Sequence, residues 1–138
     1  MSYPLLFRLP VFLSQGKIVD AYNTCSTTLS HLGETVPETV AFQDVDAIVP
    51  ETLQMVGKTF GDEWLEKEIE NESVRQILKF YTAMVTASYI IKPPHVMAYF
   101  VCKMVQLSLQ HGVSKYTPLA LLQLSNIVYT SFDNAPFL

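Results

Sequence analysis

Residues 89–124 constrain the fold more than any other part of this chain. They read YIIKPPHVMAYFVCKMVQLSLQHGVSKYTPLALLQL, which is two apolar runs with a break between them. Proline is favoured in the first turn of a helix and glycine just after the last, so Pro93-Pro94 and Gly112 suit the two ends of the first run. Thr117-Pro118 suits the start of the second. The stretch therefore predicts two helices that pack on other helices, over about 94–111 and 117–132.

The rest of the chain also has helical periodicity. Apolar residues recur at steps of three and four over 18–32, and Gly33 follows as a terminator. Further helices are expected over about 50–60 and 73–91, while residues 3–13 could form a short helix that Pro10 would kink or end. No clean alternation with a period of two is bounded by hairpin turns. The sequence predicts an all-α fold.

The expected helices are separated by recognisable start and stop signals. Residues 33–49, which contain Pro37, are predicted to be a linker, and Pro50 suits the first turn of the helix that follows. Asp62 is a candidate N-cap for a short helical segment. Ser73 and Gln76 have the spacing of a capping box at the start of the next long helix.

Few charged residues are available to cover the surface. Of 138 residues, 49% are hydrophobic and 16% are charged, whereas about a quarter are charged in a typical soluble domain. A membrane helix needs about 20 mostly apolar residues, and Lys92, Pro93, Pro94 and Lys103 interrupt the longest candidate, 84–109. The N-terminal apolar region lacks a signal-peptide cleavage site. We therefore expect a cytoplasmic protein whose apolar flanks are covered by further protein.

The last two helices have almost no polar face. Only three polar residues occur in 96–109 and three in 119–128, namely Lys103, Gln106 and Ser108, and Gln123, Ser125 and Asn126. A helix that is apolar nearly all round is buried on several sides. The C-terminal SFDNAPFL is not the polar cap that the end of a helical array requires. The chain is therefore interpreted as one helical domain, 1–138, within a longer stack of antiparallel helices.

Charge and cysteine content exclude several classes of partner. The net charge is −4 and no basic run occurs, so no nucleic-acid surface is expected. Cys25 and Cys102 each lie in an apolar helical pattern and are interpreted as free thiols. Because no C-x-x-C motif occurs, no zinc site is expected.

No motif for catalysis is complete. Gly16-Lys17 fails as a phosphate loop because the required glycine and hydroxyl positions are Val11 and Ile18. His31 and His111 lie in the last turn of their helices, where the helix dipole favours a cation, and His95 is interpreted as a surface or packing residue. The glutamates of the acidic stretch are interpreted as a solvated face, not as catalytic or calcium-binding carboxylates: Glu63, Glu66, Glu68, Glu70 and Glu72.

Aromatic side chains recur at helical spacing among valines, leucines and methionines. Core packing is the expected role of Tyr81, Tyr89, Tyr99, Phe100, Tyr116 and Tyr129. The alternative is a pocket or groove lined by some of them. No catalytic, cofactor-binding or metal-binding residue is predicted.

Two blocks of sequence resemble a known helical-repeat region. Residues 29–37, LSHLGETVP, resemble an L-x-x-L-G-E-x-h-P pattern in which h is apolar, and residues 104–114, MVQLSLQHGVS, resemble M-x-x-L-S-L-x-x-G-x-S. Both patterns occur at helix ends in tetratricopeptide-like regions of large AAA-type or STAND-type ATPases and hybrid signalling kinases. The resemblance spans about 18–128, and the chain departs from the pattern after Val128.

This resemblance implies a tetratricopeptide-like α-solenoid fragment without catalytic residues or cofactors. Its expected function is to act as a scaffold or regulatory module that binds protein, either adjacent domains of its parent or another protein. One alternative is a self-contained helical bundle that binds an apolar ligand, with Met84, Met97 and Met104 lining the pocket. The other is a protein that covers its apolar faces by self-association.

Overall fold

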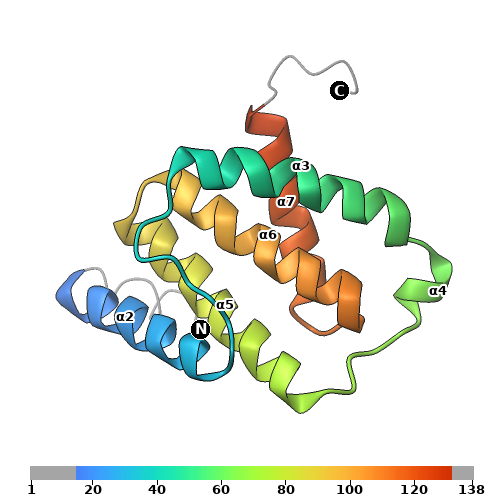
Figure 1. Cartoon of the computed structure of the whole chain (residues 1–138), viewed down its shortest axis with the longest axis horizontal. Coiled ribbons are helices and arrows are strands. Elements are labelled where there is room, and N and C mark those ends of the chain that lie inside the picture. The colour runs from blue at the N-terminus through green and yellow to red at the C-terminus, as the bar shows by residue number, and fades with distance from the viewer. Residues whose placement is uncertain (1–14, 132–138) are drawn as a thin grey trace, which may run out of the picture.

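The computed structural model describes residues 15–131, and in that range the chain is helical (Figure 1). Its helices are α2 (Gln15–His31), α3 (Phe42–Thr59), α4 (Asp62–Leu65), α5 (Glu72–Ile91), α6 (Pro94–His111) and α7 (Thr117–Ser131). The predicted all-α fold is confirmed. The only β-type pairing within these residues is a single parallel bridge between Glu68 and Val113. The possible helix at 3–13 and the expected last residue of α7, Phe132, lie outside the described residues.

Helix α6 is the centre of the fold. It packs against α3, α5 and α7, while α2 packs on α5, and Figure 1 shows α6 lying between α3 and α5. The prediction that this helix is covered on several sides is confirmed, since Val101, Cys102 and Val105 are fully buried. α2 and α3 are not an extensively packed pair.

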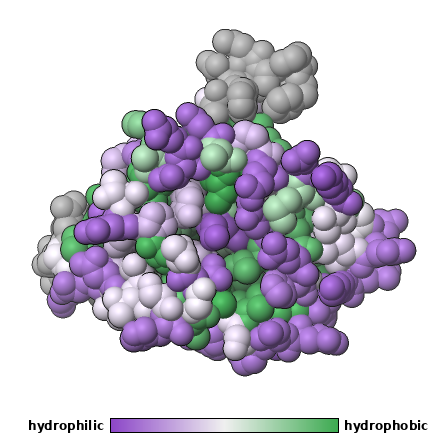
Figure 2. Space-filling view, viewed as in Figure 1, coloured by the Kyte–Doolittle hydropathy of each residue, from purple (hydrophilic) through white to green (hydrophobic). Residues whose placement is uncertain are grey.

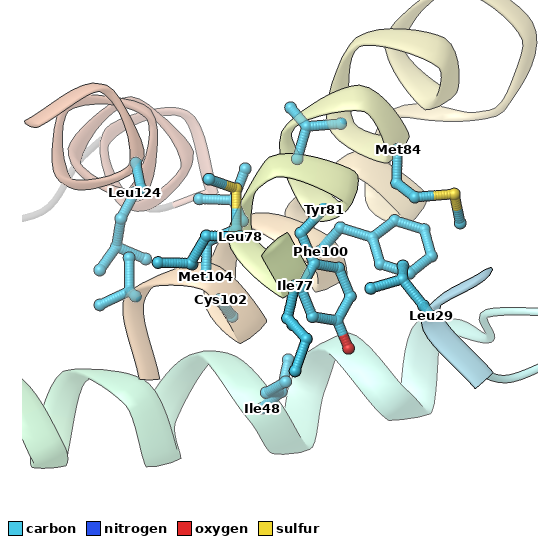
Figure 3. Close-up of a cluster of buried hydrophobic side chains, with 14 of the residues drawn as sticks. Leu29, Ile48, Ile77, Leu78, Tyr81, Met84, Phe100, Cys102, Met104 and Leu124 are labelled. Atoms are coloured by element: carbon cyan, nitrogen blue, oxygen red, sulfur yellow. The ribbon is translucent and has the colours of Figure 1, made fainter. Parts of the chain in front are cut away.

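The core joins side chains from both halves of the chain (Figure 3). Tyr81 of α5 and Phe100 of α6 lie at its centre with their ring centroids 6.1 Å apart. Leu29 of α2, Ile48 of α3 and Leu124 of α7 pack around the same cluster. Since burying one large apolar side chain contributes about 1.5–3 kcal/mol, this shared cluster stabilises the arrangement of the long helices.

Helix α3 begins earlier than the sequence predicts. It starts at Phe42 and not at Pro50, so the expected linker over 33–49 is wrong and the connection ends at Ala41. The Asp44 carboxylate accepts a hydrogen bond from the Ala41 N–H at 2.8 Å and fixes this start. A proline inside a helix costs about 3 kcal/mol. Burial of Ile48, Val49 and Thr52 offsets that cost. Pro50 has no N–H to donate to the carbonyl four residues earlier, but it is exposed, so water can solvate that carbonyl.

Two predicted caps are also corrected. The N-cap of α4 is Gly61, and Asp62 is the first helical residue. The N-cap of α5 is Asn71, whose side-chain oxygen accepts hydrogen bonds from the N–H groups of Ser73 at 2.8 Å and Val74 at 3.3 Å. The predicted Ser73–Gln76 capping box is therefore wrong, because Asn71 already satisfies the two donors.

The acidic stretch is held on the body of the molecule by two apolar residues. Its glutamates are exposed, as predicted for a solvated face, but Trp64 and Ile69 are buried. The Trp64 indole N–H donates to the Ser108 carbonyl oxygen at 2.8 Å. Beside it, the N–H of Val113 donates to the Lys67 carbonyl at 2.7 Å, and the N–H of Ile69 donates to the Val113 carbonyl at 3.0 Å. These bonds attach the α4–α5 connection to the end of α6.

Glycines end α2 and α6 as the sequence predicts. Gly33 has φ 97° and Gly112 has φ 117°, values that side-chain-bearing residues rarely adopt. Gly112 is also tightly packed, because a Cβ atom added there would lie 2.6 Å from the Lys67 carbonyl oxygen. Within 15–131, none of the helices has both the length and the apolar character needed to cross a membrane.

Candidate binding surface

The three histidines lie where the sequence places them, and one has an additional contact. His31 and His111 are in the last turns of α2 and α6. The His95 ring stacks on Phe42 with centroids 4.1 Å apart, and its Nε2 lies 2.8 Å from the Val40 carbonyl oxygen. His95 Nδ1 is buried without a hydrogen-bond partner. The packing role predicted for His95 therefore consists of holding the start of α3 against the start of α6.

Ionisable groups do not converge on a reactive centre in the described part of the chain. No group of three His, Cys, Asp or Glu side chains there could hold a metal ion. Cys25 and Cys102 are free thiols, as predicted. Burial raises the pKa of the Cys102 thiol to about 11, with an opposing hydrogen bond from Thr52. Burial also raises the pKa of Cys25. Both thiols are therefore poor nucleophiles at neutral pH, because the thiolate is the reactive form.

A buried cluster of hydroxyl groups lies at the end of α6. The Ser108 and Thr117 hydroxyls are 3.0 Å apart, and Thr117 Oγ1 accepts from the N–H of Ser114 at 2.9 Å. The Ser108 carbonyl receives the Trp64 indole N–H. The partners come from the last turn of α6, the turn after it, the first residue of α7 and α4, so the cluster joins these elements.

The aromatic residues divide into two groups. Tyr81 and Phe100 are buried, as predicted, and Tyr99 and Tyr116 are half-buried. The Tyr81 hydroxyl donates to Glu34 at 2.7 Å, and burial followed by this bond raises the pKa of Tyr81. The prediction of core packing is wrong for Tyr89 and Tyr129, which are 72% and 53% exposed. Tyr89 lies on the outside of α5, whereas Tyr129 lies beside a groove.

That groove lies between α3 and α7 and has a volume of about 570 Å³. One wall is formed by Leu53 and Val56 of α3 and by Phe60, which directly follows that helix. The groove's wall on α7 is formed by Leu121, Leu124, Ser125, Asn126, Val128 and Tyr129. No lining residue is charged. Because α3 and α7 each pack on α6, the central helix sets the spacing of the two walls.

The outer side of α7 continues this apolar surface. Leu119, Leu122 and Tyr129 are each more than half exposed, so this chain by itself does not cover α7 on several sides; its coverage by further protein stays a prediction. The other side of α7 packs on α6 through Ala120 and Leu124. The face shown in Figure 2 carries apolar patches separated by polar side chains. Adjoining exposed apolar residues of this kind mark interaction sites.

A second cleft, of about 690 Å³, is polar. It lies between the first turns of α5 and the turn that precedes α7. Arg75 forms an ion pair with Glu72 at 3.5 Å and donates to the Ile69 carbonyl, and Lys115 Nζ lies 5.3 Å from the Tyr116 ring centroid. Arg75 and Lys115 are thus directed at groups of the protein itself, and Lys79 is the third cation in the lining. The α3–α7 groove is therefore the stronger candidate for a binding surface.

Sequence reasoning did not identify this groove. The available signal was the absence of charge along 117–131, which was interpreted as coverage by further helices of a longer stack and not as a groove. No protein-family model, curated protein or solved structure matches this chain.

Proposed function

We propose that this chain is a non-catalytic helical module that binds protein through the α3–α7 groove. The observation that supports this is the gathering of exposed apolar side chains around a groove without a charged lining residue. Amphipathic helices bind such grooves by inserting apolar anchors spaced at i, i+3, i+4 and i+7. Leu53 of α3, Phe60 at its C-cap and Tyr129 of α7 are placed to contact such anchors.

The proposal includes a tetratricopeptide-like arrangement within a larger cytoplasmic signalling ATPase or kinase. Two observations support it: α2 packs on α5 while α3 packs on α6, as in two stacked helix pairs, and each block of sequence resemblance ends a helix at a glycine with positive φ. One observation distinguishes the chain from a regular repeat. α2 and α3 are joined by residues 32–41 and are not extensively packed on each other.

The alternative of an apolar ligand inside a bundle has less support. Met84 and Met104 are buried in the core. The space beside Met104 measures about 80 Å³, which is smaller than the cavities of about 150 Å³ that hold benzene. An open groove is better suited to a protein segment than to an enclosed ligand.

A peptide-binding experiment tests the proposal. A labelled, uncharged amphipathic peptide with leucines at i, i+3, i+4 and i+7 is titrated with the full chain while fluorescence anisotropy is recorded. We expect binding that a scrambled peptide of the same composition does not show. Leu53→Glu should abolish it by placing a charge in the groove wall. Tyr89→Glu, on the outside of α5, is the matched control and should bind as the unmodified chain does; equal binding of both peptides would contradict the proposal.

A further inference from the structure

We infer that the partner in the α3–α7 groove is a second copy of this chain, whose α7 packs against the first in a twofold-symmetric dimer. The inference rests on the proposed binding function of the groove and names its occupant. Three observations support it: the spacing of the exposed residues on α7, the absence of charge on that helix, and the exposed apolar area.

The exposed residues of α7 form a helix-pairing stripe. Leu119, Leu122, Asn126 and Tyr129 are all exposed and follow the three-and-four spacing by which two helices pack along a seam. Asn126 occupies one position of this stripe. A single asparagine in such a seam is known to specify the register and number of paired helices. The opposite face of α7 is already used against α6, so this stripe is a second packing face.

The stripe and the groove adjoin each other on the same helix. Asn126 and Tyr129 belong to both, since they line the groove and are also exposed on the outer side of α7. A ridge next to a groove is the arrangement that a twofold contact uses, because the ridge of each copy enters the groove of the other. The two α7 helices and the two α3 helices would then form a four-helix contact.

The absence of charge favours a second copy over a different, charged partner. No Asp, Glu, Lys or Arg occurs in α7, although the whole chain carries a net charge of −4. Two identical chains therefore repel overall, and this helix offers them a contact without like charges facing each other. The cores of protein interfaces are depleted in charged residues, and homodimer interfaces are the more apolar.

The exposed area agrees with the requirement of a stable dimer. Phe60 is 48% and Tyr129 is 53% exposed. Because a large aromatic side chain can bury 150–250 Å², the exposed parts of these two side chains amount to about 200 Å² together. With Leu53, Leu119 and Leu122 the apolar area reaches roughly 400–500 Å² per copy. A standard interface buries about 800 Å² per partner, about 65% of it apolar in homodimers. A homodimer interface of standard size therefore needs about 500 Å² of apolar area from each partner.

Sedimentation velocity of the full chain over a range of concentrations tests the inference. We expect a closed dimer with twice the 15.6 kDa mass of the single chain and a dissociation constant in the low micromolar range. Leu122→Glu should raise that constant at least about 100-fold by burying an unpaired charge. Tyr89→Glu should leave it unchanged. Because Leu122 is 58% exposed, the variant should keep its helical circular dichroism.

Asn126→Leu provides a second, independent variant. Removing the polar residue from the seam should strengthen association and produce species larger than a dimer, since the asparagine restricts the pairing to two helices. Unchanged association of this variant would place Asn126 outside the contact and overturn the inferred seam. Growth of the unmodified chain into open-ended polymers would overturn the twofold arrangement.

A monomeric wild-type chain at all concentrations would overturn the inference and leave the proposed function to be judged separately. If that monomer still bound the amphipathic peptide, and Leu53→Glu abolished the binding, only the identity of the partner would be wrong. If the monomer did not bind the peptide, the proposed function would fail as well.

Discussion

Replacing Gly112 with alanine tests how the acidic segment is attached to the core. Gly112 has φ 117° and ψ −178°, a region that is essentially restricted to glycine and costs a side-chain-bearing residue about 1–3 kcal/mol. The added Cβ would also lie 2.6 Å from the Lys67 carbonyl oxygen. Since backbone atoms cannot move independently, the 67–69 segment must separate from the end of α6.

The magnitude follows from the bonds that this separation breaks. The Val113–Lys67 and Ile69–Val113 backbone hydrogen bonds would be lost, at about 0.5–1.5 kcal/mol each. Together with the backbone strain, Gly112→Ala should lower the free energy of unfolding by about 2–6 kcal/mol. Gly33→Ala is the matched control, because Gly33 also has a positive φ but has no atom within 4 Å of the added Cβ. It should lose only about 1–2 kcal/mol.

The chain contains its own probe for this experiment. Trp64 is the single tryptophan and is buried with its indole N–H bonded to Ser108. Urea unfolding is followed by Trp64 fluorescence and by helical circular dichroism. For Gly112→Ala we expect a lower midpoint and a red-shifted emission before unfolding begins. If both glycine variants lost the same free energy of unfolding, the positive φ alone would explain the need for glycine, and the argument from close packing at Gly112 would be refuted.

Two further predictions concern buried ionisable groups. Tyr81→Phe removes the hydrogen bond to Glu34 and should cost about 1.5–3 kcal/mol, the range for a bond to a charged partner; an unchanged urea midpoint at pH 7 would contradict it. The pKa of Cys102 is raised from 9.0 to about 11 by burial, so the unfolded thiol loses its proton first as the pH rises. The contribution of this buried, neutral thiol to the free energy of unfolding is therefore complete below about pH 9. That free energy falls by roughly 3 kcal/mol as the pH rises to about 11. In the alkaline range, the free energy of unfolding of Cys102→Ala should decline less steeply with pH than that of the unmodified chain. Equal declines would contradict the raised pKa of Cys102.

The boundaries that could be predicted are those fixed by local chemistry. Pro94 and Gly112 begin and end α6 as expected because their backbone preferences are built into the residues themselves. Thr117 begins α7 as expected, and its side-chain oxygen accepts from the N–H of Ser114. The start of α3 was missed because burial against α6 outweighs the local signal of Pro50. Asn71 was missed as a cap because the nearby serine offered a similar pattern. Propensity is a weak guide wherever tertiary contacts oppose it.

The groove could not be predicted because it belongs to two helices at once. Leu53 and Tyr129 line it together, and nothing local in 42–59 or 117–131 indicates that α3 and α7 lie on the same side of α6. A helical segment without charged residues, such as 117–131, predicts burial against another surface. It does not say whether the covering surface belongs to the same chain.

The contacts that α5 and α6 make with earlier segments have a consequence for synthesis on the ribosome. Glu34 is made 47 residues before its partner Tyr81, Val40 is made 55 residues before His95, and Trp64 is made 44 residues before Ser108. At about 5–20 residues per second, these segments wait roughly 2–11 seconds for their partners. The helices α5, α6 and α7 follow one another through short turns and can associate almost as they emerge. Residues 34–64 should therefore be the part of this region that chaperones bind during synthesis.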